Sequence, residues 1–194
     1  RLAKAGFNVI LGSRDGAKAV ATAAEVGNGI TGADNVECSA KSDLVIVAVP
    51  WDSHKDTLTS LKNELVGKVV IDCVNPMGFD AGGAFPLAVE EGSACAQAQG
   101  ILSESYVVTA FNHVSAVLLS DQSLAQIDID IMVVGDHKPA TDLVQQMVDQ
   151  IAGMRGIYAG KMRNAGQVEA LTANLISMNR RYKTHAGVRV IGVN

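Results

Sequence analysis

A hydroxyl and two cations lie close together near the start of the chain. Ser13 and Arg14 follow Phe7–Gly12, a short apolar segment typical of a buried strand, and Lys18 comes one helical turn after Arg14. At the end of the second strand of a dinucleotide-binding fold, an acidic residue would bind the ribose hydroxyl of NAD, whereas an arginine can donate charge-assisted hydrogen bonds to the 2′-phosphate of NADP. The three residues therefore predict a 2′-phosphate site; the alternative is a solvated surface turn.

Polar and apolar side chains also follow other strand-like segments. Three near-continuous apolar segments are typical of buried parallel strands: Asp43–Pro50, Lys68–Val74 and Tyr106–Phe111. Their carboxyl ends, and the loops that follow, carry the candidate cofactor-binding residues Val49, Pro50, Trp51, Asn75, Pro76, Met77, Asn112, Val114 and Ser115. Because the carboxyl ends of parallel strands meet at one edge of a sheet, we expect these residues to line a ligand groove. An apolar wall with a few amides and hydroxyls suits a flat, uncharged ring.

A nicotinamide cofactor carries the chemistry of hydride transfer itself and needs orientation more than acid or base groups from the protein, so we expect no Ser/His/Asp triad. His113 is the one histidine in the predicted groove. It could hydrogen-bond a ligand or cap the following helix, and both remain open. His54 and His137 are predicted to be solvated.

Strand-like and helix-like segments alternate along the chain. Further strands are expected over Ile129–Val134 and Ile157–Ala159, and helices over Ala17–Val26, Asp52–Leu65, Ala88–Gln99, Pro139–Ile151 and Ala165–Val190. Asn75–Gly83 has the composition of a loop. Alternation of this kind predicts an α/β fold with a Rossmann-type, doubly wound, mainly parallel sheet. We expect residues 1–160 to form the NADP-binding domain and residues 161–194 a small helical part.

The glycine-rich turn that cradles a pyrophosphate does not occur in its usual place. Arg1–Ala5 has the pattern of the end of a helix that Gly6 caps, and Gly12 follows the second strand instead of the first. We therefore expect a chain truncated at its N-terminus, without the first, central strand. Removal of a central strand uncovers its neighbours, so poor stability is expected.

Composition excludes several classes of partner. Of the 194 residues, 48% are hydrophobic and 19% charged, and the net charge is −4. Neither a nucleic-acid surface nor a membrane surface is predicted, since both need clustered lysine and arginine. The three cysteines form no CxxC pair, which favours free thiols in a cytoplasmic protein, and no metal site is expected.

Five segments together resemble the NADPH-dependent F420 reductases, also called F420H2:NADP oxidoreductases. They are VILGSRD (Val9–Asp15), IVAVPW (Ile46–Trp51), VNPMGF (Val74–Phe79), AFNHVSAVLL (Ala110–Leu119) and RNAGQVEALTANLISMNRRYKTHAG (Arg163–Gly187). Any Rossmann domain could supply the first two, whereas the last two are specific. The resemblance covers the whole chain and implies NADP(H) as one cofactor and coenzyme F420, an 8-hydroxy-5-deazaflavin, as co-substrate.

On the NADP side, Ser13, Arg14 and Lys18 match the family's 2′-phosphate cluster, which agrees with the argument from the residues themselves. Val49 and Pro50 match strand-end positions that line the NADP groove.

On the deazaflavin side, the resemblance implies that Ala116 lies near the nicotinamide and that Asn112, Val114 and Thr172 line the F420 groove. It also implies that residues 161–194 complete this groove and contact a second subunit in a homo-oligomer, expected to be a dimer.

The sequence departs from the family at the acceptor side. The position of Asn112 is a histidine in the archaeal branch, where His113 is a threonine, and Gly166 and Ala170 replace an arginine and a serine. These departures concern the details of F420 binding more than the reaction class. Two alternatives stay open as well: an NADPH-dependent reductase of a flavin, metal ion or imine, and a nucleotide-sensing module that is catalytically crippled by the absence of the glycine-rich turn.

Overall fold

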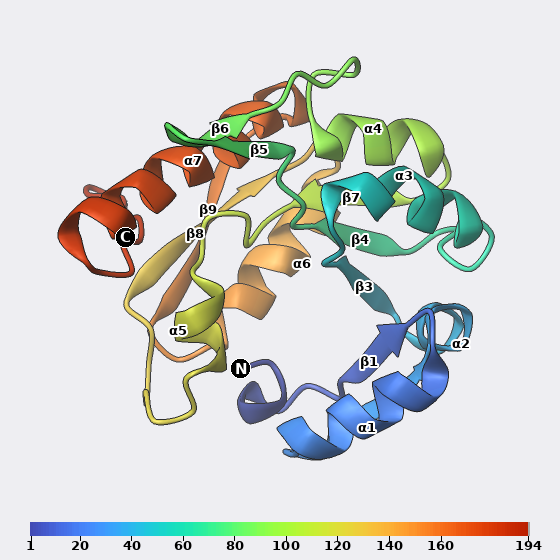
Figure 1. Ribbon diagram of the computed structural model, residues 1–194. Helices are drawn as coiled ribbons and strands as arrows, with labels where there is room; N and C mark the ends of the chain where they lie inside the picture. The colour runs from blue at the N-terminus through green and yellow to red at the C-terminus, as the bar shows by residue number, and fades with distance from the viewer. Residues whose placement is uncertain (194) are drawn as a thin grey trace.

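A five-stranded sheet forms the centre of the protein. The computed structural model describes residues 1–193. The strands follow the order β3 (Leu44–Val47), β4 (Val69–Asp72), β7 (Tyr106–Thr109), β8 (Ile129–Val134) and β9 (Met154–Gly160). β3, β4 and β7 are parallel; β8 runs antiparallel to β7, and β9 runs parallel to β8. The predicted α/β fold with a mainly parallel sheet is confirmed (Figure 1).

Helices cover both faces of this sheet. They are α3 (Trp51–Ser60), α4 (Ala94–Ile101), α6 (Lys138–Asp149) and α7 (Ala165–Tyr182). Neighbouring residues of one strand face opposite layers: Val70 packs in the core with α3, α4 and the start of α7, whereas Ile71 packs in the core with α6. Because side chains alternate along a strand, a sheet buried on both sides needs continuous apolar strands, as the sequence has.

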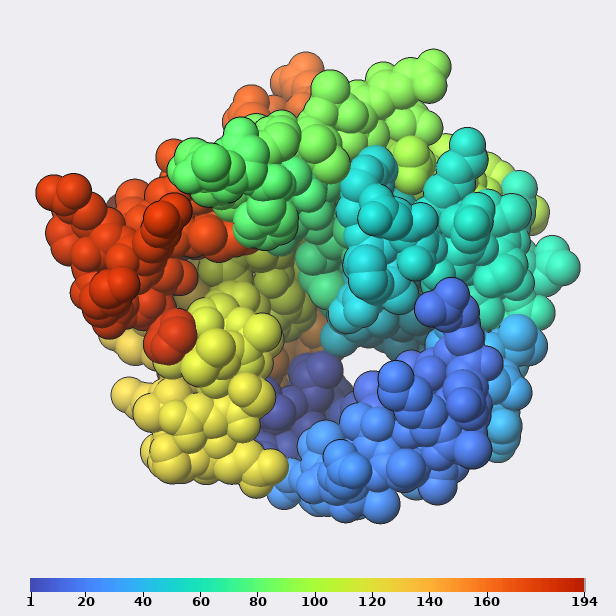
Figure 2. Space-filling view, viewed as in Figure 1, coloured from blue at the N-terminus to red at the C-terminus, as the bar shows by residue number. Residues whose placement is uncertain are grey.

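The N-terminal part forms a second, smaller sheet. β1 (Ile10–Ser13) pairs in parallel with β2 (Thr31–Asp34), and α1 (Gly16–Val26) and α2 (Asn35–Lys41) pack on them. Within residues 1–193, β1 forms no ladder with β3. The two sheets lie apart in Figure 1, and Figure 2 shows an opening between them. The expected truncation at the N-terminus stays a prediction.

Several elements differ from the sequence prediction. The segment predicted as a loop contains a β-hairpin, β5 (Met77–Asp80) and β6 (Gly83–Pro86). A short helix, α5 (Ala116–Ser120), and the 3₁₀ turns η1 (Ala3–Ala5) and η2 (Met162–Asn164) complete the elements. As predicted, Gly6 caps the first of these turns in the left-handed conformation, with φ of 92°.

The last helix is shorter than predicted. α7 ends at Tyr182 because Lys183 is left-handed, and the following segment runs back along β8. There Asp130 binds Arg155 and Arg189, and its carboxylate accepts from the Val190 amide at 2.6 Å. These interactions hold the C-terminal segment against the sheet.

Within residues 1–193, no helix is long and apolar enough to cross a membrane, and no group of three or more histidine, cysteine or acidic side chains could hold a metal ion.

Candidate cofactor-binding site

A cavity of about 690 Å³ lies between the carboxyl ends of β3, β4 and β7 and the N-terminal part of the chain, which contributes Arg1, Leu2, Ala3, Val9 and Ile30 to its wall. Its wall includes seven residues of the predicted groove: Asn75, Asn112, His113, Val114, Ser115, Ala116 and Thr172. Apolar side chains supply most of the remaining wall, among them Ile46, Phe111 and Leu175. The volume lies within the range of pockets that bind drug-sized ligands, about 300–1,000 Å³.

Asn112 joins three parts of the chain at this cavity. Its carbonyl oxygen accepts from Asn75 Nδ2 at 2.7 Å and from the Thr172 hydroxyl at 2.9 Å, which links the loop after β4 to α7. Its own side chain is buried: Nδ2 donates to the Val74 carbonyl at 3.3 Å, and Oδ1 lies 2.9 Å from the Thr109 hydroxyl. The side-chain amide is thus engaged within the protein, and Asn112 positions Asn75 and Thr172.

Phe111, directly before Asn112, has a φ of 64°. The left-handed region is uncommon for a bulky residue, and such strain persists where surrounding contacts enforce it, as at ligand sites. No sequence signal marked this residue, because its apolar character fitted the end of a strand.

Two buried polar atoms in the cavity wall have no partner among the described residues: Asn75 Oδ1 and His113 Nδ1. His113 Nε2 lies 3.2 Å from the Met132 backbone N–H, which can only donate. Nε2 is therefore the acceptor, and Nδ1 carries the proton of the neutral ring. Burial lowers the pKa of His113 and favours this neutral form. Asn75 and His113 thus both line the cavity, and each carries one buried polar atom that has no side-chain or backbone partner within hydrogen-bond distance among the described residues.

The expected 2′-phosphate residues lie at the end of β1, in the turn that follows it and at the start of α1, outside the wall of the cavity. Ser13 ends β1, and its hydroxyl accepts from the Asp15 amide at 3.2 Å. Arg14 and Lys18 are exposed, and neither forms an ion pair with the rest of the described chain. The Asp15 carboxylate instead caps α1 by accepting from the amides of Ala17 and Lys18. Both cations are therefore available to an anion from solution.

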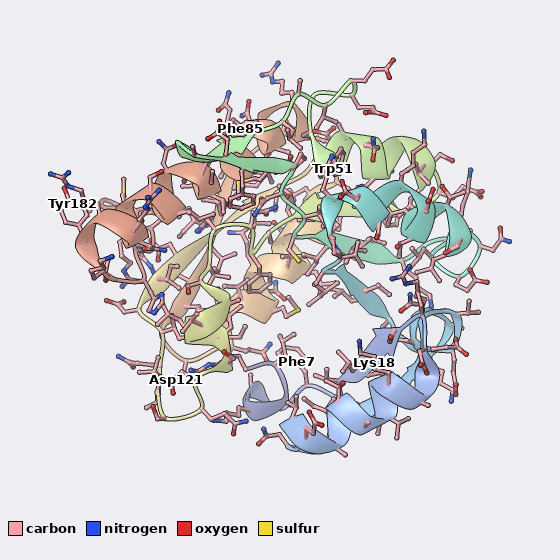
Figure 3. The ribbon with its side chains drawn as sticks, in the orientation of Figure 1. Phe7, Lys18, Trp51, Phe85, Asp121 and Tyr182 are labelled. Carbon is pink, nitrogen blue, oxygen red and sulfur yellow. The ribbon has the colours of Figure 1, made fainter. Side chains whose placement is uncertain are left out.

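The other predicted groove residues lie beside the cavity. Val49 and Trp51 pack against the core under α3, and Pro50 is the exposed N-cap of that helix. Pro76 is buried and Met77 begins the hairpin. Figure 3 shows Lys18 on α1 and Trp51 at the start of α3 on opposite sides of the opening. Their contacts with a cofactor stay predictions.

The prediction that His54 is solvated is wrong. His54 is fully buried: Nε2 lies 2.8 Å from Asp72 Oδ2, and Nδ1 lies 3.1 Å from Gln97 Oε1. Burial disfavours the charged ring, but the bonds to Asp72 and Gln97 outweigh it and raise the pKa of His54. Asp72 Oδ1 also accepts from the Val74 amide at 3.0 Å, so this buried pair holds the loop that carries Asn75. The spacing of His54 three residues after Trp51, on the inner face of α3, is the signal that was missed.

Residues 1–76 match the family described as NADP oxidoreductase, coenzyme F420-dependent. The F420-dependent NADP reductase of Methanothermobacter marburgensis is 35% identical over 98% of this chain and 90% of its own length, and that of Methanocaldococcus jannaschii is 32% identical over 98% and 90%.

Solved structures of other proteins share the fold. The crystal structure of a putative F420-dependent NADP reductase from Arthrobacter sp. FB24 superposes with a TM-score of 0.82 at 24% identity, over 97% of this chain and 91% of that one. An imine reductase from Myxococcus stipitatus superposes with a TM-score of 0.64 at 16% identity, over 94% of this chain and 57% of that one. The sequence identities to the reductases of Methanothermobacter marburgensis and Methanocaldococcus jannaschii decide the assignment: the chain belongs to the F420-dependent NADP reductase family.

Proposed function

We propose that this protein transfers a hydride between NADP(H) and coenzyme F420. The observation that supports this best is the cavity, an apolar hollow lined by Asn75 and His113, each of which has one buried polar atom without a partner among the described residues. A nicotinamide presents a carboxamide, and a deazaflavin presents carbonyl and N–H groups at one edge of an otherwise apolar ring. Both atoms therefore fit ligands of this kind.

The residues of the chain would act by binding and orientation. Asn75 Oδ1 would accept from a ligand N–H group, and His113 Nδ1–H would donate to a ligand carbonyl. The nicotinamide and deazaflavin rings supply the hydride chemistry when bound. Apolar residues such as Val114 and Ala116 would exclude water from the space where the rings meet.

Where β1 passes into α1, Ser13, Arg14 and Lys18 would bind the 2′-phosphate. Val49, Pro50 and Trp51 would line the path of NADP between the sheets. Pro76 and Met77 would border the ring. These roles are supported by the place of each residue at a strand end or helix start.

For the chain as a whole, we propose a cytoplasmic homodimer in which residues 161–194 supply the subunit contact. The exposure of Met178 and Tyr182 on α7, 44% and 72%, supports this, because large exposed apolar side chains often mark interfaces. Residues 1–160 would form the NADP-binding domain.

The function is tested by following the loss of F420 absorbance with NADPH as donor. We expect turnover of F420 with NADPH and much slower turnover with NADH. FMN and a cyclic imine are the comparison acceptors. Turnover of either comparison acceptor without turnover of F420 would refute the proposal.

A further inference from the structure

A second hollow lies beside the main cavity. It encloses about 380 Å³ between the tip of the β5–β6 hairpin and the end of α7, and Figure 1 shows the hairpin lying along that helix. We call it the hairpin groove, and its lining residues are Gly82, Gly83, Ala84, Ile176, Ser177, Arg180, Arg181 and Lys183. Ile176 also lines the main cavity, so the two hollows share a wall.

All charged side chains that line the hairpin groove are positive. Arg180, Arg181 and Lys183 are exposed, and no acidic side chain belongs to the lining. Within residues 1–193, none of the three cations forms a salt bridge. The hairpin carboxylate, Asp80, accepts instead from the amides of Gly82 and Gly83 at 2.7 and 3.1 Å. In a chain of net charge −4, three unpaired cations in one hollow form a local site for an anion.

The backbone at Lys183 supports a binding role. Lys183 has φ of 54° and ψ of 46° at the C-cap of α7. Glycine is the usual residue in this left-handed position, with asparagine next, because other side chains crowd the backbone there. A glycine at this position would be less strained but has no side chain. Lys183, in contrast, contributes an ammonium group to the lining of the groove.

We propose that the hairpin groove binds the anionic tail of the deazaflavin substrate, which carries a phosphodiester and glutamyl carboxylates. The inference rests on the proposed function. With the ring in the main cavity, the tail would pass Ile176 and meet the three cations. Arginine guanidinium groups donate two parallel hydrogen bonds to phosphate or carboxylate, which suits a tail with both groups.

The test compares F420 with the tail-less deazaflavin, whose ring carries only a ribityl chain. In the double variant Arg180→Glu/Arg181→Glu, we expect the Kd for F420 by isothermal titration calorimetry, and its KM with NADPH, to rise at least about tenfold. The Kd and KM for the tail-less compound should differ by less than about twofold between the double variant and the unchanged protein, because a surface substitution away from a ligand usually has only a small effect. Added KCl should weaken F420 binding to the unchanged protein far more than binding of the tail-less compound.

Two single variants separate binding from folding. Lys183→Gly relieves the left-handed strain, so its melting temperature should be equal or higher while F420 binding weakens. Lys62→Glu, an exposed cation on neither hollow, should bind F420 as the unchanged protein does.

The outcomes are distinct. Unchanged F420 affinity in the double variant overturns the groove proposal, as does an equal loss for F420 and the tail-less compound. If the unchanged protein binds and reduces neither deazaflavin, the proposed function fails and the groove proposal fails with it. If it uses both deazaflavins equally well at every salt concentration, only the groove proposal fails.

Discussion

Replacement of Arg14 tests the choice between NADP and NAD. Arg14 is exposed at the start of the turn between β1 and α1 and pairs with no carboxylate among residues 1–193. In Arg14→Ala the turn should keep its shape, because Ser13 and Asp15 hold it by their own hydrogen bonds. The variant therefore removes a charge with little effect on folding.

The expected size of the effect follows from the exposure of the site. A hydrogen bond to a charged group contributes about 1.5–3 kcal/mol. Because Arg14 is open to solvent, the lower half of this range applies, and about 1.5–2 kcal/mol corresponds to a loss of roughly 10- to 30-fold in NADPH affinity. NADH lacks the 2′-phosphate, so its affinity should change by less than about twofold, the spread of a surface substitution. Arg14→Asp should weaken NADPH further by repulsion.

The assay is the KM of each nucleotide with F420 as acceptor, together with a direct Kd from titration calorimetry. Lys62→Ala serves as a matched control for loss of an exposed cation, and Lys18→Ala should resemble Arg14→Ala with a smaller effect. Equal weakening of NADPH and NADH in Arg14→Ala would refute the assignment of the 2′-phosphate site, since it would place Arg14 against a part that both nucleotides share.

Three further predictions concern stability, each measured as the free energy of unfolding in urea. Burial raises the pKa of Glu169 from 4.5 to about 7, so its contribution to stability is present below pH 4.5 and is lost as the pH rises to about 7; the unchanged protein should lose stability relative to Glu169→Gln between pH 5 and 8, and parallel pH profiles would contradict this. Asp130→Asn leaves Arg155 without its buried partner and should cost about 3 kcal/mol; a loss under about 1 kcal/mol would show that the pair matters little. Gly32→Ala places a methyl group 2.4 Å from the backbone of Ala19 and should cost at least about 2 kcal/mol, whereas Gly100→Ala, with open space around it, should not destabilise.

The parts of the fold that could be predicted from sequence are those buried on both faces. The segment over Ile129–Val134 was predicted with the bounds that the structure has, because a covered strand must be apolar at every position. The start of α6 was predicted from Pro139, which fits a helix's first turn. In both cases the local sequence alone is enough to explain why the element forms where it does.

Other elements depend on contacts that a local pattern does not contain. β2 reads TGAD, with one apolar residue besides glycine, and exists because it pairs with β1 and receives α1 against Gly32. The β5–β6 hairpin was predicted as a loop because Gly78 and Gly83 resemble loop residues; in the structure Gly78 lies beneath the ring of Phe85. His54 was predicted as exposed because its partner Asp72 lies on another element.

In the candidate site, too, the positions of the residues could be predicted from sequence, whereas the roles of single side chains could not. Its residues were found because strand ends of a parallel sheet meet at one edge, which is a property of topology. Their individual roles depend on hydrogen-bond geometry: Asn112 was expected to contact the ligand, yet its amide is engaged by Val74 and Thr109 and its carbonyl by Asn75 and Thr172. With Asn75 Nδ2 engaged in this way, the amide oxygen of Asn75, a residue of the cavity wall, has no partner among residues 1–193. Under the proposed function, Asn112 would therefore act on the ligand through Asn75, and we expect Asn112→Asp to weaken cofactor binding, measured as the Kd by titration calorimetry, without direct contact between the substituted side chain and the cofactor.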